Sequence, residues 1–341
     1  MVNLFVTWDQ IGSSTGGGIV TANELKALQT IDETYVINPP MTNNPFEADE
    51  IALQEYKNQN IKPKLAHFYA NTYSQLIKLL KKDGVKITYT IAAHNIQHSQ
   101  EEHENLGMPF NLPHLTDPNL FKKYIEGILL ADVVITPSHY SKHILECFGC
   151  KNVQVIPHGI DIPWKPKKIK EFSVGYLGSS APDKGLKYLI EAWSLLNYKD
   201  TLLTIAGRNS ESLLPLVRQG RGNVHLAGFV EDTSTLYNSC NVYVQPSVTE
   251  GFGIEVLEAM SYGKGVICSM GAGAAQCINS CGRIVPIRHP QAIASAIDYY
   301  KNNPEILQTD GELAQTISKD YSWENIIKQY CKVWNNVLTA I

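Results

Sequence analysis

Two glycines stand between two carboxylates in residues 250–258, a stretch that reads Glu-Gly-Phe-Gly-Ile-Glu-Val-Leu-Glu. Free backbone N–H groups at the start of a helix bind phosphate, and a carboxylate about one turn further along can accept two hydrogen bonds from a ribose diol. Gly251, Gly253, Glu250 and Glu258 therefore predict a nucleotide site. The plainer alternative is that the glycines only form a tight turn and the glutamates only favour a helix start.

The residues on either side explain how these groups would be held. Residues 242–245 form a short apolar run that is typical of a buried strand, and residues 253–262 have the apolar spacing of a helix. Gly251 and Gly253 would thus lie where a strand passes into a helix. Because glycine has no Cβ, the backbone there can approach a ligand closely.

The same alternation of strands and helices runs along the whole chain. It predicts parallel sheets with helices on both faces, an α/β fold of two Rossmann-like, doubly wound domains. The expected strands are 4–7, 34–37, 65–69, 87–91, 133–136, 153–156, 172–177, 202–206, 224–227, 242–245, 265–268 and 282–285. The expected helices are 21–29, 47–58, 73–83, 119–130, 138–148, 184–196, 210–218, 232–238, 253–262, 272–279, 290–302, 305–317 and 322–338.

A length of 341 residues allows two domains. We expect an N-terminal domain over 1–161, a proline- and lysine-rich linker over 162–170, and a C-terminal domain over 171–318. Residues 319–341 contain a last helix, which we expect to pack back on the first domain. Two such domains place a cleft between the carboxyl ends of their sheets, where ligands bind.

Composition narrows the class of partner. The net charge is −4 and no basic patch stands out, so a nucleic-acid partner is not expected. No run of 18 apolar residues exists, and the N-terminus lacks the basic segment of a signal peptide, so we expect a cytoplasmic protein. Residues 76–82 mix leucines with lysines, which fits peripheral contact with the inner membrane face but is also typical of an ordinary domain helix. The oligomeric state is left open.

The cysteines do not predict a metal centre. Cys147 and Cys150 form one pair at close spacing, and Cys277 and Cys281 form another. Together they would make four zinc ligands. They fall in different expected domains, so we interpret them as reduced thiols and expect no metal or other cofactor.

Five stretches resemble the motifs of a known family. The chain resembles a retaining glycosyltransferase of family 4, which uses nucleotide-sugar donors and has the GT-B fold of two Rossmann-like domains facing across a cleft. The resemblance covers nearly the whole second half of the chain and is patchy in the first. It rests on Glu250–Gly263, Tyr176–Gly185, Val155–Asp161, Ala131–Ser138 and Thr15–Gly18.

The resemblance also implies roles for single residues. It places Glu258 on the ribose hydroxyls and Glu250 beside the sugar, where oxocarbenium charge develops. It implies that His94 binds the donor sugar or assists the acceptor, although an ordinary loop histidine is an equal alternative. Contacts to the diphosphate and the base would come from Lys184, the loop at Gly17 and Gly18, the backbone around Phe252, Gly253 and Ile254, and the main chain near Val230.

Two positions depart from the pattern of the family. Ser179 stands where the family usually has an arginine that helps Lys184 neutralise the diphosphate, and Arg208 is a candidate to compensate. Glu255 stands where the family often has proline. A carboxylate in the first turn suits the helix dipole but repels a diphosphate.

The leading hypothesis is a retaining, hexosyltransferase-like enzyme that works without a metal, because the chain has no Asp-x-Asp motif at a strand end. Its partners would be a nucleotide-sugar donor and a sugar, lipid-linked or protein acceptor. A GT-B nucleotide-sugar epimerase and a non-catalytic nucleotide-sugar-binding protein are the alternatives. A dinucleotide-dependent dehydrogenase fits less well, because residues 15–19 do not read G-x-G-x-x-G.

Overall fold

A computed structural model describes residues 2–13, 15–42, 44–163, 169, 171–208, 213–220 and 222–340. The chain divides into two compact units. Unit 1 contains Met1–Ala93, Asn111–Gly159 and Trp323–Ile341, and unit 2 contains His94–Phe110 and Ile160–Ser322. The chain therefore passes between the units four times. Most of the expected 162–170 linker lies outside the described residues.

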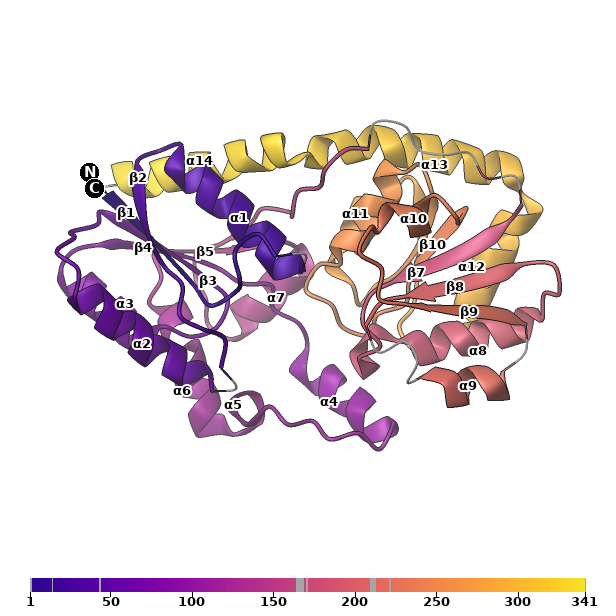
Figure 1. The fold of residues 1–341 in the computed structure, drawn as a ribbon, viewed down its shortest axis with the longest axis horizontal. Helices are drawn as coiled ribbons and strands as arrows, with labels where there is room; N and C mark the ends of the chain where they lie inside the picture. Colours follow the sequence, from indigo (N-terminus) through magenta and orange to yellow (C-terminus); the bar gives the residue numbers. More distant parts are fainter. Residues whose placement is uncertain are drawn as a thin grey trace. The chain divides into compact units, whose positions relative to one another are not determined.

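Unit 1 is built on a six-stranded parallel sheet in the order β2-β1-β3-β4-β5-β6 (Figure 1). Parallel neighbours need long crossover connections, and helices supply them. The strands are β1 (Val2–Thr7), β2 (Glu33–Ile37), β3 (Leu65–Tyr69), β4 (Lys86–Thr90), β5 (Val133–Thr136) and β6 (Val153–Val155). The helices are α1 (Gly16–Gln29), α2 (Pro45–Lys57), α3 (Ser74–Lys82), α5 (Pro113–Thr116), α6 (Pro118–Leu129), α7 (His139–Cys147) and α14 (Trp323–Thr339).

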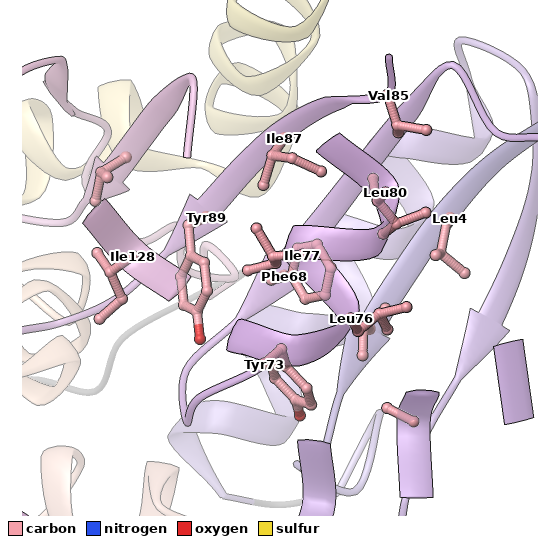
Figure 2. Packing of buried hydrophobic residues seen from close by; sticks show 14 of the residues in the cluster. Leu4, Phe68, Tyr73, Leu76, Ile77, Leu80, Val85, Ile87, Tyr89 and Ile128 are labelled. Carbon is pink, nitrogen blue, oxygen red and sulfur yellow. The ribbon is translucent and has the colours of Figure 1, made fainter. Parts of the chain in front are cut away.

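Helix α3 supplies part of the core of unit 1. Figure 2 shows Leu76, Ile77 and Leu80 packed among strand residues such as Phe68, and all four side chains are fully buried. These three side chains serve the core, as in an ordinary domain helix, and peripheral membrane contact through residues 76–82 stays a prediction. Two lysines of α3 lie outside and form ion pairs, Lys78 with Glu126 at 2.7 Å and Lys81 with Asp132 at 2.6 Å.

Helix α14 packs against α1 and closes one side of unit 1. Its Trp334 is fully buried, and the indole Nε1–H donates to Thr88 Oγ1 at 3.1 Å. Beside it, His67 Nε2 lies 3.1 Å from Glu24 Oε2, with both side chains fully buried. Long-range packing of this kind, in addition to helix propensity, holds the helix in place.

Unit 2 has a second six-stranded parallel sheet, in the order β12-β11-β10-β7-β8-β9. The strands are β7 (Ser173–Leu177), β8 (Leu202–Ala206), β9 (Asn223–Gly228), β10 (Val242–Gln245), β11 (Gly265–Ser269) and β12 (Gly282–Val285). Alternate strand residues feed two separate apolar clusters, one on each face. The α-helices are α4 (Ile96–Asn105), α8 (Leu186–Leu196), α9 (Leu214–Gln219), α10 (Ser234–Tyr237), α11 (Ile254–Ser261), α12 (Pro290–Asn302) and α13 (Pro304–Ser318).

The predicted class, two Rossmann-like parallel sheets with alternating helices, is confirmed. Several elements differ from the expectation. Helix α1 begins at Gly16, because Thr15 caps it by accepting a hydrogen bond from the N–H of Gly18. The helix expected over 272–279 is a short 3₁₀ turn, Gly273–Cys277, and helix α4 was not predicted. Of the helix expected over 210–218, the described part is α9, since residues 209–212 lie outside the described ranges.

No helix in the described part of the chain has both the length and the apolar character needed to span a bilayer.

Candidate active site

The turn between β10 and α11 is fixed by the backbone of residues 250–253. Gly253 caps α11 with φ at +89°, a left-handed conformation that favours glycine. The N–H of Glu250 donates to Gly271 O at 2.9 Å, and the carbonyl of Phe252 accepts from the N–H of Ala274 at 2.8 Å. The side chain of Phe252 lies in the core, 2% exposed, so its predicted part in ligand binding is limited to its backbone.

A series of hydrogen bonds between buried side chains at the end of β10 holds the chain that leads into this turn. The hydroxyl of Tyr243 donates to Gln245 Oε1 at 2.6 Å, and Gln245 Nε2 donates to Ser247 Oγ at 2.8 Å. The hydroxyl of Ser269 donates to the carbonyl of Ser247. All four residues are buried, so these bonds satisfy groups that would otherwise be costly to bury.

Lys184 and Glu250 form an ion pair, which brings two of the sequence motifs together. Gly185, at φ +70°, permits this approach, because a Cβ there would lie 2.1 Å from the carbonyl oxygen of Pro246. Burial by itself would lower the pKa of Lys184, but the nearby carboxylates of Glu250 and Glu255 outweigh it and raise that pKa above the usual value. Lys184 is therefore a fixed cation in a partly enclosed position.

Glu258 lies one turn into α11 and accepts a hydrogen bond from the hydroxyl of Tyr237 at 2.6 Å. Burial raises the pKa of Glu258 to about 7, with the charges of Glu255 and Asp161 adding to the rise and the Tyr237 hydrogen bond opposing it. Burial also raises the pKa of Glu255. The start of α11 thus carries carboxyl groups that are protonated more readily than is usual.

Three further predicted residues lie at the carboxyl ends of β7, β8 and β9. The carbonyl of Ser179 accepts from the hydroxyl of Tyr176 at 2.9 Å, and the N–H of Ser180 donates to the carbonyl of Arg208 at 3.3 Å. The guanidinium of Arg208 stacks 5.1 Å from the ring centroid of Phe229. Val230 is half-buried and packs against the core. Ser179 and Arg208 are therefore neighbours in space, as compensation between them requires.

His94 belongs to unit 2, although it was expected in the N-terminal domain. The N–H of the next residue, Asn95, donates to Thr249 Oγ1 at 2.7 Å. Thr249 directly precedes Glu250, so this hydrogen bond joins the residue after His94 to the residue before Glu250. Gly17 and Gly18 lie in the first turn of α1 in unit 1, where a Cβ at Gly17 would be 2.7 Å from Asp9 Oδ1. The other predicted site residues all lie in unit 2.

Known proteins resemble this chain in sequence and in fold. Residues 171–303 match the family model of the group 1 glycosyl transferases. An uncharacterised glycosyltransferase of Haemophilus influenzae is 26% identical over 360 aligned residues, which cover 96% of this chain and 97% of that protein. The sucrose-phosphate synthase of Thermosynechococcus elongatus superimposes with a TM-score of 0.80 at 18% identity and full coverage of both chains.

The chain is a glycosyltransferase with the GT-B fold. A second neighbour in structure, HepE of Anabaena, was solved in complex with UDP-glucose. It is 18% identical, with a TM-score of 0.71 and coverage of 98% of this chain and 100% of that one. At these identities the structural likeness supports the fold.

Sequence reasoning missed several residues of this glycosyltransferase that hold the predicted ones in place. They are Tyr176, Tyr237, Tyr243, Gln245, Ser247 and Thr249, which act through the hydrogen bonds given above. The polar side chains Gln245 and Ser247, at the end of an apolar strand, were a readable signal. The tyrosines were not, because a core tyrosine looks the same in sequence whether or not its hydroxyl meets a site residue.

Proposed function

We propose that this glycosyltransferase transfers a sugar from a nucleotide-sugar donor with retention of configuration, without a metal ion. The observation that carries the proposal is the placement of Lys184, Glu250 and Glu258 around the glycine-capped start of α11. One cation, a helix N-terminus and a carboxylate one turn further along match the diphosphate and the ribose of such a donor.

The ion pair between Lys184 and Glu250 suggests how a bound donor would change the site. Without ligand, Lys184 holds Glu250. A bound diphosphate carries more negative charge than one carboxylate, so it would draw the ammonium group toward itself and leave Glu250 available to the sugar. As the bond to the leaving diphosphate breaks, Lys184 and the N–H groups at the start of α11 would stabilise the charge that develops there.

The same geometry supports a nucleotide-sugar donor, and the complex of HepE with UDP-glucose supports a UDP-sugar as the first candidate. Glu258 would bind the ribose hydroxyls, and the main chain near Val230 would meet the base. The acceptor would be a sugar, a lipid-linked sugar or a protein. His94, held near Glu250 through Asn95 and Thr249, would contact the donor sugar or the acceptor.

Binding and turnover test the proposal. Calorimetric titration with UDP, GDP and ADP should give measurable affinity for one of them. Incubation with UDP-glucose, GDP-mannose and ADP-glucose should then give slow hydrolysis of the matching donor. Formation of an epimer would identify an epimerase, and binding without any turnover would identify a non-catalytic protein.

We expect turnover to persist in EDTA, because Lys184 and the helix N-terminus carry the charge stabilisation that a metal would supply. The measurement is the rate of donor hydrolysis before and after chelation. Loss of activity in EDTA with recovery on adding magnesium or manganese would contradict the metal-independent mechanism.

A further inference from the structure

Helix α4 is covalently flanked on both sides by segments of unit 1, yet it belongs to unit 2. One face of the helix makes the attachment. Asn95, Ser99 and Glu102 repeat at the spacing of a single helical face, and Ser99 and Glu102 are 3% and 1% exposed. That face is polar, so specific hydrogen bonds must hold it where apolar packing normally would.

Glu102 is the centre of this attachment. Its Oε1 accepts from Arg288 Nε at 2.6 Å, and its two oxygens lie 3.1 and 3.0 Å from the hydroxyl of Tyr188. A second nitrogen of the same guanidinium donates to Glu101 Oε2 at 2.7 Å. A buried carboxylate needs partners of this kind, and Arg288 supplies the opposite charge.

Arg288 itself has a backbone conformation that points to a function. It lies between β12 and α12, with φ at +57°. This left-handed conformation costs a bulky residue conformational free energy. Such strain persists where the contacts around the residue hold it in place. The contacts present are the two glutamates of α4.

The two ends of the attachment meet different parts of the site. Asn95 at the start of α4 bonds Thr249, next to Glu250. Glu102, about 10 Å further along the helix, bonds Tyr188 on α8, which follows the turn that carries Lys184. Helix α4 also packs against that turn, Pro182–Lys184. A shift of α4 would therefore move His94 relative to both Lys184 and Glu250.

We propose that Arg288 is a positioning residue of the transferase, which clamps α4 to unit 2 through Glu102 and Glu101 and thereby holds His94 beside the Lys184–Glu250 pair. The inference rests on the proposed function. Arg288 does not belong to the set of residues assigned to the nucleotide, so its loss should disturb the chemical step more than donor binding.

The test compares Arg288→Ala and Arg288→Lys with Arg283→Ala. Arg283 is a matched control in the same unit, because it pairs with Asp310 at 3.2 Å and stacks on Tyr299 and Tyr300. The readouts are hydrogen exchange of the amides of residues 96–105, affinity for UDP, and kcat and KM for hydrolysis of UDP-glucose, GDP-mannose or ADP-glucose, whichever the unaltered protein turns over.

We expect Arg288→Ala to speed exchange in α4 and to lower kcat by about 10- to 100-fold, the cost of a small misplacement in an active site. KM for the donor and affinity for UDP should stay within about twofold, because the nucleotide contacts are intact. Arg288→Lys keeps the positive charge but cannot form the paired guanidinium hydrogen bonds to Glu101 and Glu102, so its kcat should be intermediate. Arg283→Ala should leave exchange in α4 unchanged.

Three outcomes overturn the proposal. Unchanged exchange in α4 would show that Arg288 does not clamp it, and unchanged kcat with faster exchange would show that the clamp does not serve the reaction. Equal loss of kcat in Arg283→Ala would indicate a general loss of stability. If Arg288→Ala does not fold, Arg288→Lys and Tyr188→Phe carry the same test. Failure of the proposed function is separate, since the unaltered protein would then bind none of UDP, GDP and ADP.

Discussion

At the scale of single residues, the predicted cation of this site is already engaged. Lys184 and Glu250 are 22% and 19% exposed, so water screens their attraction only in part. A ligand must compete with Glu250 for the ammonium group, and a diphosphate can do so because it carries the larger charge. Selectivity for a diphosphate over a neutral nucleoside follows from this competition.

Lys184→Ala should weaken binding of UDP by about 1.5–3 kcal/mol and binding of uridine much less, because only UDP carries charge to pair. Calorimetric titration with both ligands measures the difference. The exposed Lys199→Ala serves as the control for loss of a positive charge in unit 2. Equal losses for UDP and uridine would mean that Lys184 supports the fold and does not bind phosphate.

Glu258→Gln should weaken nucleotide binding by about 1–3 kcal/mol at pH 8, because two charge-assisted hydrogen bonds to the ribose become neutral ones. Calorimetric titration with UDP is the measurement. Unchanged affinity would remove Glu258 from the nucleotide site.

The raised pKa of Glu258 adds a pH dependence. With a pKa of about 7 in the folded protein, the acceptor form is lost below that value, so affinity for uridine should rise between pH 6 and pH 8. Glu258→Gln should abolish this rise, and Tyr237→Phe should move it to higher pH, since the tyrosine hydroxyl lowers the pKa. Because the pKa of Glu258 in the folded protein exceeds the ordinary glutamate value of 4.5, Glu258 contributes stability at low pH that declines as pH rises from 4.5 to about 7.

At the scale of elements, the junction of β10 and α11 needs one glycine for its conformation. Gly253 has φ at +89°, while a Cβ there would have its nearest neighbour 3.5 Å away, at Glu250 Cγ. Space is therefore available, and the backbone angle alone limits the position to glycine.

Gly253→Ala should destabilise the protein by about 1–2 kcal/mol, the cost of a left-handed alanine. Denaturant unfolding measures the loss. Gly16→Ala is the comparison, because Gly16 has no positive φ and, among the described residues outside its own turn, no atom lies within 4 Å of its Cβ position. A similar loss in both variants would show that strain at Gly253 is not the cause.

Which elements could be predicted depended on where their information lies in the chain. The strands and most helices were predicted, because apolar periodicity is local and the two sheets follow from it. Helix α4 was missed because its buried face carries Ser99 and Glu102, and its anchor Arg288 is 186 residues away from Glu102. Residues 272–279 were predicted to be helical on the same kind of pattern, but the structure has a short 3₁₀ turn there.

In the candidate site, too, local features could be predicted and contacts between distant segments could not. Glu250, Gly253 and Glu258 were predicted together because one strand–helix junction holds them. The pairing of Lys184 with Glu250 could not be predicted, since it depends on how two loops of the sheet edge pack through Gly185 and Pro246.

At the scale of the whole molecule, unit 1 depends on a helix that follows unit 2 in sequence. Trp334→Ala should lower the stability of unit 1 by about 3–5 kcal/mol, because a fully buried side chain and its bond to Thr88 are lost. Trp193→Ala is the matched change in unit 2, where Trp193 is also fully buried. Differential scanning calorimetry with and without UDP separates the two, since UDP should raise the transition of unit 2 more, where most of the predicted nucleotide contacts lie. The reverse assignment of the two transitions would contradict this division of the chain.

The packing of α14 against unit 1 also determines when unit 1 can finish folding during synthesis. The strands of unit 1 leave the ribosome before residue 160, but the helix that covers Thr88 and His67 begins at Trp323. At ordinary rates of translation, roughly ten to thirty seconds pass between the two. During that interval the part of the unit 1 surface that α14 later covers is exposed. We therefore expect chaperones to bind and protect the nascent first half until the residues after 323 emerge.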